Sequence, residues 1–407
     1  MLKRGGYGID WKHRLGIFPR LQKSGKKRLW IQAVSVGEVR AIERLVTLLG
    51  KNYEIVLTVT TTTARKVVSE KFPPNILFHG YFPWDFWLFS WAAWERIRPD
   101  AVILVEGELW PEHIYQAKAR RVPVFLINGR LSDRSFQYYR NFSRFARWIF
   151  EKLDFISASS EQSRRRIASF YGKKIENFGN MKCDIPCPLL SQAERKNLKK
   201  ELGFSENSFV LVGCSTWPGE EALLLAALRE IQRKQSEKSG GDWALLLVPR
   251  HAERRSDLVQ WLSRERVSFV QRSQGVAPRE VDVCLGDTTG ELSRLVQVAD
   301  LAYIGKSLFP HSGGQSPLEA AMAGAPIIYG DRMTNFRDIC AQIEREGAAI
   351  KVTDKREAIG TIAALAGDLP RRKILARNIN HWFEKNRGAS EKTYHFIRKK
   401  LDQCKEN

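Results

Sequence analysis

The sequence predicts an α/β fold in which two doubly wound, Rossmann-like domains face a central cleft. Short apolar runs alternate with amphipathic stretches, which is typical of parallel sheets covered by helices on both faces. The alternation stops in a proline-containing segment and then starts again. The 407 residues are also too many for one typical hydrophobic core, so we expect two.

The first half of the chain contains five short runs rich in Val, Ile, Leu and Phe, which are predicted strands. Helical spacing of apolar residues follows the first two of them, at 38–49 and 63–71. We therefore predict an N-terminal domain over 1–182. The five strands are expected at 29–35, 54–60, 101–106, 123–127 and 153–157.

A softer stretch at 183–190 contains Pro186 and Pro188, which break any helix, and we interpret it as the linker. The strand series then restarts, and it predicts a C-terminal domain over 191–388. We expect 389–407 to form a charged C-terminal helix that packs back on the N-terminal domain. The five strands of the second domain are expected at 208–214, 243–248, 281–285, 300–304 and 325–329.

The composition is that of a globular protein with a strong excess of basic residues. Lys and Arg number 66 against 45 Asp and Glu, a net charge of +21. Residues 1–190 carry +15 of this excess. The excess favours an anionic partner, such as nucleic acid, an anionic membrane surface or a phosphorylated substrate, although a solvated basic surface gives the same count. No apolar run reaches the length of a membrane span, and the six cysteines follow no metal-ligand spacing.

The first candidate site follows the strand at 29–35. Ser35 and Gly37 stand where a helix begins, and their backbone N–H groups can hold an anion, while Gly37 permits a tight turn. Glu38 would lie at the carboxyl edge of the sheet, where a carboxylate can take a proton from an acceptor hydroxyl. The alternative is that Glu38 only interacts favourably with the helix dipole.

Two further loops of this domain carry charged residues directly after strands. Glu106 and Glu108 flank a glycine, and they can bind sugar hydroxyls or position the base; alternatively, Glu108 caps the helix that Pro111 begins. Arg130 and Arg134 lie four residues apart around a possible N-cap at Ser132, so they can clamp a carboxylate or phosphate or simply face solvent. We place all four side chains in the acceptor site.

The second domain has four polar loops at strand ends or helix starts, and together they predict a nucleotide site. Glycines with hydroxyl donors can hold a phosphate, Arg250 can neutralise it, and Glu319 can bind ribose hydroxyls. Lone histidines such as His13 and His79 have no ligand partners at useful spacing, so we expect no metal and no cofactor. The candidate residues are Ser215, Thr216, Pro249, Arg250, His251, Gly290, Glu291, Leu292, Ser316, Pro317, Leu318 and Glu319.

An aromatic stretch at 81–98 contains four tryptophans, whose spacing predicts that they share one face of a helix. That face either packs inside the domain or contacts a membrane interface or an acyl chain, where Trp is favoured. The tryptophans are Trp84, Trp87, Trp91 and Trp94.

These motifs, in this order and spacing, resemble those of 3-deoxy-D-manno-octulosonic acid (Kdo) transferases of the lipid IV-A type. The resemblance runs from about residue 10 to the C-terminus. VSVGE, the E-x-E-x-W-P loop and N-G-R-L-S are its most specific parts. The matching motifs are VSVGE at 34–38, EGELWP at 106–111, NGRLSDRS at 128–135, PRH at 249–251, GDTTGEL at 286–292 and GGQSPLEAA at 313–321.

The resemblance implies an inverting glycosyltransferase of lipopolysaccharide biosynthesis that moves Kdo from CMP-Kdo to a lipid A precursor. It also implies that Glu38 is the general base and that the second-domain loops line the CMP site. The expected location is the cytoplasmic face of the bacterial inner membrane, with peripheral attachment or an N-terminal anchor in a longer form. The anionic membrane surface is then a partner, and it offers a reason for the basic first domain.

Two departures from the family pattern are visible. Gln315 and Ser316 stand where the family usually has His-Asn, so Ser316 keeps a hydroxyl but lacks the amide. The chain also begins close to the basic run at 8–16, ahead of which relatives commonly carry an apolar segment.

Two other hypotheses are weighed against this one. A GT-B lipid glycosyltransferase that uses another nucleotide sugar, such as a UDP-hexose, would share the fold and part of the loop set. A nucleic-acid-binding protein is motivated only by the net charge of +21. Because the chain has no arginine-rich helix or base-stacking motif of a known module, we expect no nucleic-acid partner.

Overall fold

The computed structural model describes residues 10–22, 24–72, 76–235 and 242–403. The chain forms two compact units, Met1–Pro186 with Asn386–Asn407, and Cys187–Lys385. The first division falls inside the segment 183–190 that we interpreted as a linker, and the second lies at 385/386, where the prediction was 388/389. Each unit is described by itself.

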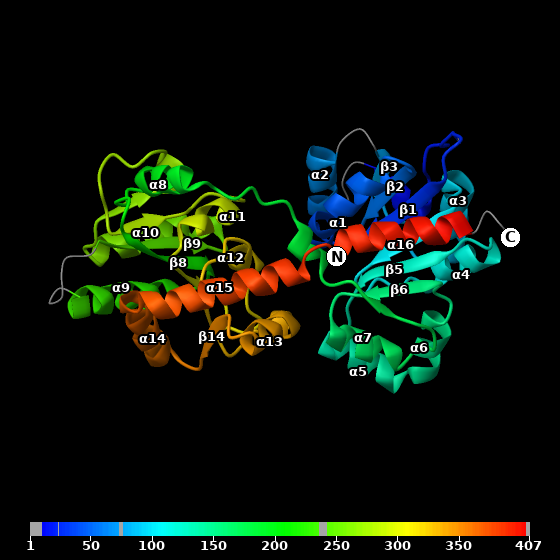
Figure 1. Ribbon diagram of the computed structural model, residues 1–407. Helices are drawn as coiled ribbons and strands as arrows, with labels where there is room; N and C mark the ends of the chain where they lie inside the picture. Colours follow the sequence, from blue (N-terminus) through cyan, green and yellow to red (C-terminus); the bar gives the residue numbers. More distant parts are fainter. Residues whose placement is uncertain (1–9, 23, 73–75, 236–241, 404–407) are drawn as a thin grey trace. The chain divides into compact units, whose positions relative to one another are not determined.

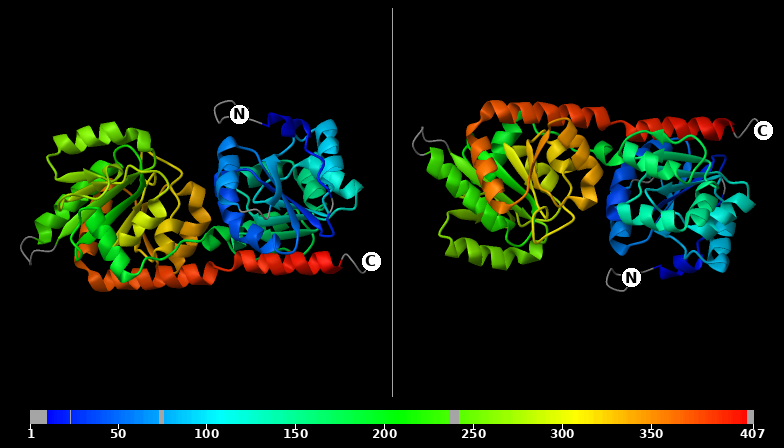
Figure 2. Two further views of the ribbon diagram at one scale, coloured as in Figure 1. Left: turned by 90° about the horizontal axis from the view of Figure 1, so that it is seen from above. Right: turned by 90° about the horizontal axis from the view of Figure 1, so that it is seen from below.

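The N-terminal unit is built on a parallel seven-stranded sheet of order β3-β2-β1-β4-β5-β6-β7. Helices cover both of its faces (Figures 1 and 2). The strands are β1 Arg28–Ala33, β2 Glu54–Val59, β3 Ile76–Tyr81, β4 Ala101–Val105, β5 Val124–Gly129, β6 Phe155–Ala158 and β7 Glu176–Asn177. The helices are η2 Trp11–Leu15, α1 Val36–Leu49, α2 Thr62–Lys71, α3 Trp87–Ile97, α4 Pro111–Ala119, α5 Asp133–Asn141, α6 Ser143–Phe150, α7 Glu161–Ala168, η3 Met181–Asp184 and α16 Ala389–Gln403.

Alternate side chains of these strands enter two separate cores, as the period of two in a strand requires. Leu29 and Ile31 of β1 pack with α1, α2 and α16 on one face. Trp30, between them, packs with α3, α4 and α6 on the other face. Both cores are apolar, which explains why the central strands are apolar throughout.

The C-terminal helix α16 belongs to the N-terminal unit, although some 200 residues separate it from the rest of that unit's sequence. Its start is held by Asp184, whose carboxylate accepts hydrogen bonds from the backbone N–H groups of Gly388 at 2.7 Å and Ser390 at 2.6 Å. Its buried residues pack into the same core as α1. Arg44 of α1 forms an ion pair with Glu391.

The C-terminal unit repeats the design, with a parallel seven-stranded sheet of order β10-β11-β9-β8-β12-β13-β14. Apart from β10 and β7, the two sheets follow one plan. The first strand of each unit lies in the middle, the next two in the chain lie on one side of it, and the following three lie on the other side. The strands are β8 Phe209–Thr216, β9 Trp243–Pro249, β10 Phe269–Gln271, β11 Val283–Leu285, β12 Leu301–Ile304, β13 Ile327–Gly330 and β14 Ala349–Val352. The helices are α8 Gln192–Glu201, α9 Glu220–Gln235, η4 Ala252–Arg254, α10 Arg255–Arg264, η5 Arg272–Gln274, α11 Leu292–Leu295, η6 Val296–Val298, α12 Leu318–Met322, η7 Thr334–Phe336, α13 Arg337–Arg345, α14 Lys355–Gly367 and α15 Leu369–Asn386.

The α/β class with two doubly wound units is thus confirmed, and all ten predicted strands are present. The four strands that the sequence did not predict are β3, β7, β10 and β14, the two edges of each sheet. Edge strands have one unpaired side and are half exposed here, so they lack the continuous apolar run that marks a central strand.

The prediction for the four tryptophans is wrong. Trp84 precedes α3, and Trp94 is buried in the core, whereas Trp87 and Trp91 are exposed. The helix begins six residues later than the aromatic stretch because residues up to Tyr81 complete β3. The stretch therefore divides into a buried contribution and an exposed one.

Candidate functional site

Three carboxylates gather at the carboxyl edge of the N-terminal sheet. Glu38 follows β1, and Glu106 and Glu108 follow β4; β1 and β4 are paired neighbours in parallel orientation, so their ends meet at one edge. The charges sense one another. The negative charge of Glu106 raises the pKa of Glu38, and the charges of Glu38 and Glu106 both raise the pKa of Glu108. The sequence predicted this grouping.

Glu38 is buried in the first turn of α1, where it exchanges hydrogen bonds with the N-cap residue. Its carboxylate accepts hydrogen bonds from the Val34 N–H at 2.8 Å and the Ser35 hydroxyl at 2.9 Å, and the Ser35 oxygen accepts from the Glu38 N–H at 3.3 Å. Burial raises the pKa of Glu38, whereas these hydrogen bonds and the charge of Lys182 oppose the increase. The helix-start interaction and a catalytic role are therefore compatible.

Gly37 does not form the separate tight turn that we predicted. It lies within the first turn of α1, and its φ is not positive. A Cβ added there would meet only the Ser35 hydroxyl, at 3.8 Å. The missing side chain instead leaves open space beside Glu38.

Glu106 is held in a strained position by the residues around it. Its φ is 59°, in the left-handed region that non-glycine residues avoid. Asn128, at the end of β5, also has a positive φ of 51° and accepts a hydrogen bond from the Met181 N–H at 3.1 Å. Two neighbouring strand ends with this geometry are typical of a functional site.

Lys182 is the residue of this site that sequence reasoning missed. Its ammonium lies 2.7 Å from the Glu106 carboxylate, and its charge lowers the pKa of Glu38. We assigned the neighbouring residues to the linker because the two prolines of the segment were its strongest signal. The chain instead returns across the carboxyl edge in η3, between Asn128 and α1.

Glu108 does not cap α4, so that alternative is wrong. The N–H groups of Glu112 and His113 are capped by Asp85, at 3.1 Å from each. Burial, followed by the charges of Glu38 and Glu106, raises the pKa of Glu108 to about 7. At neutral pH this carboxyl can therefore either donate or accept a proton.

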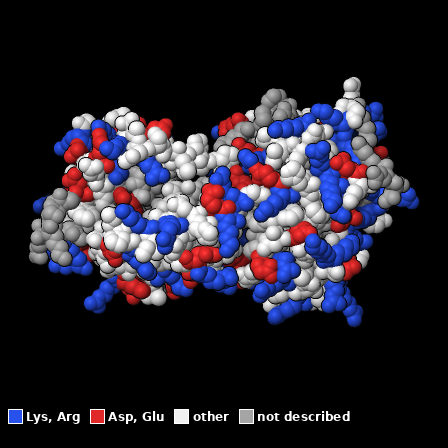
Figure 3. Space-filling model, viewed as in Figure 1, with Lys and Arg blue, Asp and Glu red and all other residues white. Residues whose placement is uncertain are grey.

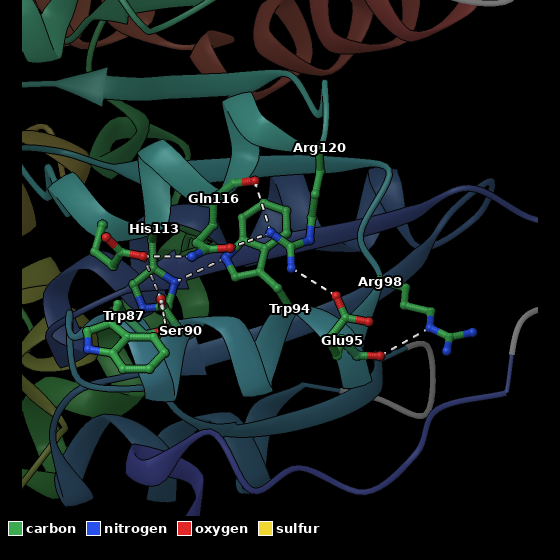
Figure 4. Close-up of polar contacts among 9 residues, drawn as sticks. Trp87, Ser90, Trp94, Glu95, Arg98, His113, Gln116 and Arg120 are labelled. Atoms are coloured by element: carbon green, nitrogen blue, oxygen red, sulfur yellow. Dashed lines mark hydrogen bonds and ion pairs between the residues drawn. The ribbon is translucent and has the colours of Figure 1, made fainter.

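A polar network anchors α4, and with it the carboxylate loop, to α3 (Figure 4). The Trp94 indole donates to Nδ1 of the fully buried His113 at 3.3 Å. Burial lowers the pKa of His113 to about 3, so this imidazole is neutral and has a structural role. The outer part of the network runs from Ser90 through Glu112, Gln116 and Arg120 to Glu95.

The two arginines of the next loop occupy different environments. Ser132 is the N-cap of α5, as predicted, and accepts a hydrogen bond from the Ser135 N–H at 3.1 Å. Arg130 lies before the helix, directly after β5, whereas Arg134 is exposed in its first turn. Their spacing of four residues therefore does not place them on one helix face.

In the C-terminal unit, the loops after neighbouring strands are joined by hydrogen bonds and ion pairs. The Arg250 N–H donates to the Thr216 carbonyl at 3.1 Å, which links the loops after β9 and β8. Arg255 pairs with Asp287 at 2.9 Å, which brings the loop after β11 beside them. The Gly314 N–H donates to the Lys306 carbonyl at 3.0 Å. Contacts thus join the loops after β8, β9 and β11 within the unit, and the loop at 313–319 joins the loop after β12.

The loop after β12 meets the loop after β8 very closely. Ser215 and Lys306 both have positive φ, of 55° and 61°, and a Cβ at Gly305 would collide with the Ser215 carbonyl. Glu220, buried at the start of α9, accepts hydrogen bonds from the N–H groups of Trp217 at 2.8 Å and Lys306 at 2.8 Å. This carboxylate therefore holds the two loops together.

Cationic and aromatic side chains surround Trp217 at this edge. The Lys306 ammonium lies 4.3 Å from the centre of one of its rings, and the rings of His251 and His311 lie 5.4 and 5.5 Å from it. Exposed Arg250 follows β9 beside them. The sequence predicted Arg250 and His251 but not Lys306 or His311, because contacts between loops have no spacing signal.

The remaining predicted residues differ in how accessible they are. One carboxylate oxygen of Glu319 is buried with no hydrogen-bond partner among the described residues. The Ser316 oxygen accepts from the Leu318 N–H at 3.2 Å. Thr216 is fully buried and its hydroxyl donates to Glu221, so its side chain faces inward. Glu291, preceding α11, accepts from Thr288.

Among the residues that the structure describes, no group of three or more His, Cys, Asp or Glu side chains is arranged to hold a metal ion. Within the same ranges, no helix combines the length and the apolar character needed to cross a bilayer.

Sequence comparison identifies relatives over nearly the whole chain. The family described as 3-deoxy-D-manno-octulosonic-acid transferase (kdotransferase) matches residues 10–185. The 3-deoxy-D-manno-octulosonic acid transferase of Haemophilus influenzae is 29% identical over 96% of this chain and 91% of its own. That of Bordetella pertussis is 29% identical over 90% and 85%. The resemblance that the motifs predicted is confirmed.

Comparison with solved structures supports the fold. A UDP-GlcNAc 2-epimerase from Neisseria meningitidis covers 92% of this chain with all of its own, at a TM-score of 0.63 and 15% identity. A glycosyltransferase from Rickettsia africae covers 93% with 99% of its own, at a TM-score of 0.60 and 13% identity. At these identities the likeness concerns the two-domain GT-B architecture alone.

Proposed function

We propose that this glycosyltransferase moves Kdo from CMP-Kdo to a lipid A precursor in lipopolysaccharide biosynthesis, since residues 10–185 match the family of Kdo transferases. The full-length similarity to named Kdo transferases supports the choice of donor sugar. The observation that carries the proposal is the carboxylate group at the end of β1 and β4, in which Glu38 and Glu108 both have raised pKa values.

Glu38 acts as the general base in this proposal. It accepts the proton of the acceptor hydroxyl as that oxygen attacks the anomeric carbon of Kdo, and CMP leaves from the opposite face, so the configuration inverts. Burial and the charge of Glu106 raise the pKa of Glu38. The higher pKa makes the ionised carboxylate a stronger base, and it moves the pH range in which Glu38 is ionised to more alkaline values.

Glu106, Glu108 and the arginines bind the acceptor. Glu108, with a pKa of about 7, can exchange hydrogen bonds with a sugar hydroxyl in either protonation state. Arg130 and Arg134 offer planar guanidinium donors to the phosphate of the lipid. Lys182 holds the Glu106 carboxylate in place through its ion pair.

The C-terminal loops bind CMP-Kdo. Arg250 and Lys306 supply positive charge for the phosphate that departs with CMP, and the rings of His251 and His311 lie beside them around Trp217. The unpaired Glu319 oxygen accepts from ribose hydroxyls. Pro249, Gly290, Leu292, Pro317 and Leu318 complete the site through backbone and apolar contacts.

The proposed reaction needs no metal ion. The Lys182 ammonium already balances the carboxylates of the acceptor site, where it disfavours a second cation. A monophosphate leaving group carries less charge than a diphosphate, so side-chain cations at the donor site suffice. The acceptor is a membrane lipid, and we place the protein at the cytoplasmic face of the inner membrane.

The direct test is mass spectrometry of reactions that contain CMP-Kdo, a tetraacyl disaccharide phosphate and a chelator. We expect the acceptor mass to increase by one or more Kdo units, and the increment counts the residues added. Calorimetry with CMP, UMP and UDP tests the donor, and we expect CMP to bind most tightly. Tighter binding of a uracil nucleotide, or no Kdo product, would reject the proposal in favour of another nucleotide sugar.

A further inference from the structure

Helices α5 and α6 form a surface of aromatic and basic side chains that faces solvent. Tyr138, Phe142, Phe145 and Trp148 are 42–55% exposed. Arg134, Arg140, Arg144, Arg147 and Lys152 lie among them in the sequence, and we call these nine residues the α5–α6 surface. The segment 133–152 has a net charge of +3. Figure 3 shows basic side chains over the end of the N-terminal unit where these helices lie.

Few side chains of these two helices are buried. None of the nine residues of α5 is buried, and only Ala146, Ile149 and Phe150 of α6 enter the core. The exposed rings contact one another instead: Tyr138 and Phe142 are 5.0 Å apart, and Phe145 stacks on Trp148 at 5.9 Å. The segment therefore displays apolar area that another surface can cover.

The basic residues of this surface are available to an external anion. Arg134, Arg140, Arg144 and Arg147 form no ion pair with any carboxylate of the residues that the structure describes. The Lys152 ammonium lies 4.8 Å from the centre of a Trp148 ring. Aromatic residues interleaved with unpaired arginines are typical of helices that lie in the interface of an anionic membrane.

A second exposed aromatic surface, formed by Phe86, Trp87, Leu88 and Trp91 around the start of α3, provides a contrast. The segment 84–98 contains two acidic and two basic residues, so its net charge is zero. The network of Figure 4 also ties α3 to α4. Charge complementarity to an anionic partner thus favours the α5–α6 surface.

We propose that the α5–α6 surface binds the face of an anionic phospholipid bilayer, with its aromatic rings in the headgroup region. This inference rests on the proposed function, in which the acceptor is a membrane lipid. The position of the surface suits that acceptor, since α5 follows β5, the parallel neighbour of β4, and Glu106 and Glu108 follow β4 at the same edge of the sheet. The bound bilayer would present lipid headgroups next to the carboxylates.

Sedimentation of the full chain with vesicles tests the proposal. We expect binding to vesicles of phosphatidylglycerol and phosphatidylcholine, little binding to phosphatidylcholine alone, and weaker binding as salt increases. The double variant Arg144→Glu/Arg147→Glu should bind the anionic vesicles about tenfold more weakly or worse. Phe145→Ser/Trp148→Ser should lose about tenfold.

The matched control is Trp87→Ser/Trp91→Ser on α3, which should bind within about twofold of the unchanged protein. Circular dichroism and thermal unfolding verify that each variant is folded. Unchanged binding by the charge-reversal variant, or an equal loss in the α3 variant, would overturn the proposal. Tighter binding to single-stranded RNA than to the anionic vesicles at the same salt would also overturn it.

Activity assays separate this inference from the proposed function. On an acceptor dispersed in detergent, the α5–α6 variants should keep the kcat of the unchanged protein. On the same acceptor embedded in anionic vesicles, their KM should rise about tenfold. If the unchanged protein transfers no Kdo in detergent, the proposed function fails while the vesicle-binding result still decides the role of this surface.

Discussion

The two units present the same sheet plan with opposite chemistry at their carboxyl edges. In each unit the helix after the central strand carries a buried glutamate in its first turn, Glu38 in α1 and Glu220 in α9. Glu220 accepts from the backbone N–H groups of Trp217, Lys306 and Ser307. Among the described residues, Glu38 accepts only from Val34 and Ser35, which lie four and three positions before it in the chain.

The neighbouring strand shows the same contrast. A left-handed residue follows β4 in one unit and β12 in the other, but it is Glu106 in the first and Lys306 in the second. One edge therefore gathers carboxylates and the other gathers cations around an indole. The shared sheet plan supplies the positions, whereas the loop residues decide whether an edge gathers carboxylates or cations.

The largest effect is expected from the replacement of Glu38, the buried glutamate of the first unit. Replacement by Gln keeps the shape but removes the base, so we expect kcat to fall about 10²–10⁴-fold. The Kd for CMP, measured by calorimetry, should stay within about twofold because the donor loops are untouched. Glu43→Gln on the same helix is the control, and a Glu38→Gln variant with normal turnover would assign the proton transfer elsewhere.

Glu220 tests the opposite case, a carboxylate whose role is structural. Replacement by Ala leaves buried N–H donors without acceptors, which costs about 2–4 kcal/mol of the free energy of unfolding. Denaturant titration measures this loss, and Glu38→Gln should show less than about 1 kcal/mol. Equal destabilisation by the two changes would show that the two glutamates do not differ as their hydrogen bonds indicate.

Lys306 tests the cationic edge. Replacement by Met keeps much of the side-chain volume over Trp217 but removes the charge, so we expect the Kd for CMP to rise about tenfold. Calorimetry at two salt concentrations should show a smaller salt dependence than in the unchanged protein. Lys351→Met, which removes a cation from β14, serves as the control and should leave the Kd unchanged.

The smallest effects are expected from variants that change the charges around Glu38. Lys182 lowers the pKa of Glu38 and Glu106 raises it, so removing each charge should move that pKa in opposite directions. If ionised Glu38 is the base, the acid limb of the pH profile of kcat/KM should move to higher pH in Lys182→Met and to lower pH in Glu106→Gln. We expect shifts of about one unit, and shifts of the same sign would contradict the arrangement.

Glu108 offers a matching test on stability. Its folded pKa of about 7 exceeds the ordinary value of 4.5, so the folded state retains a proton that the unfolded state releases between these pH values. This costs stability above pH 7 and nothing below pH 4, where both states are protonated. Glu108→Gln should therefore raise the free energy of unfolding at pH 8 by about 1–3 kcal/mol, and by much less at pH 4.

Most of the fold was predictable because central strands and their helices carry strong patterns. All ten predicted strands lie inside the two sheets, and Ser132 is the N-cap that its sequence position indicated. Edge strands escaped because half-exposed residues do not form an apolar run. Lys182 escaped because a loop that crosses a sheet edge is recognisable only once the edge exists.

The sequence by itself determined the two-unit α/β class and which charged residues follow which strands, since local patterning and parallel strand direction decide both. Only the tertiary structure decided what those residues do to one another. Lys182 pairs with Glu106, Asp85 caps α4, and Trp94 is buried while Trp87 is exposed. Each outcome depends on distance and burial between segments far apart in the chain, and no sequence spacing encodes these quantities.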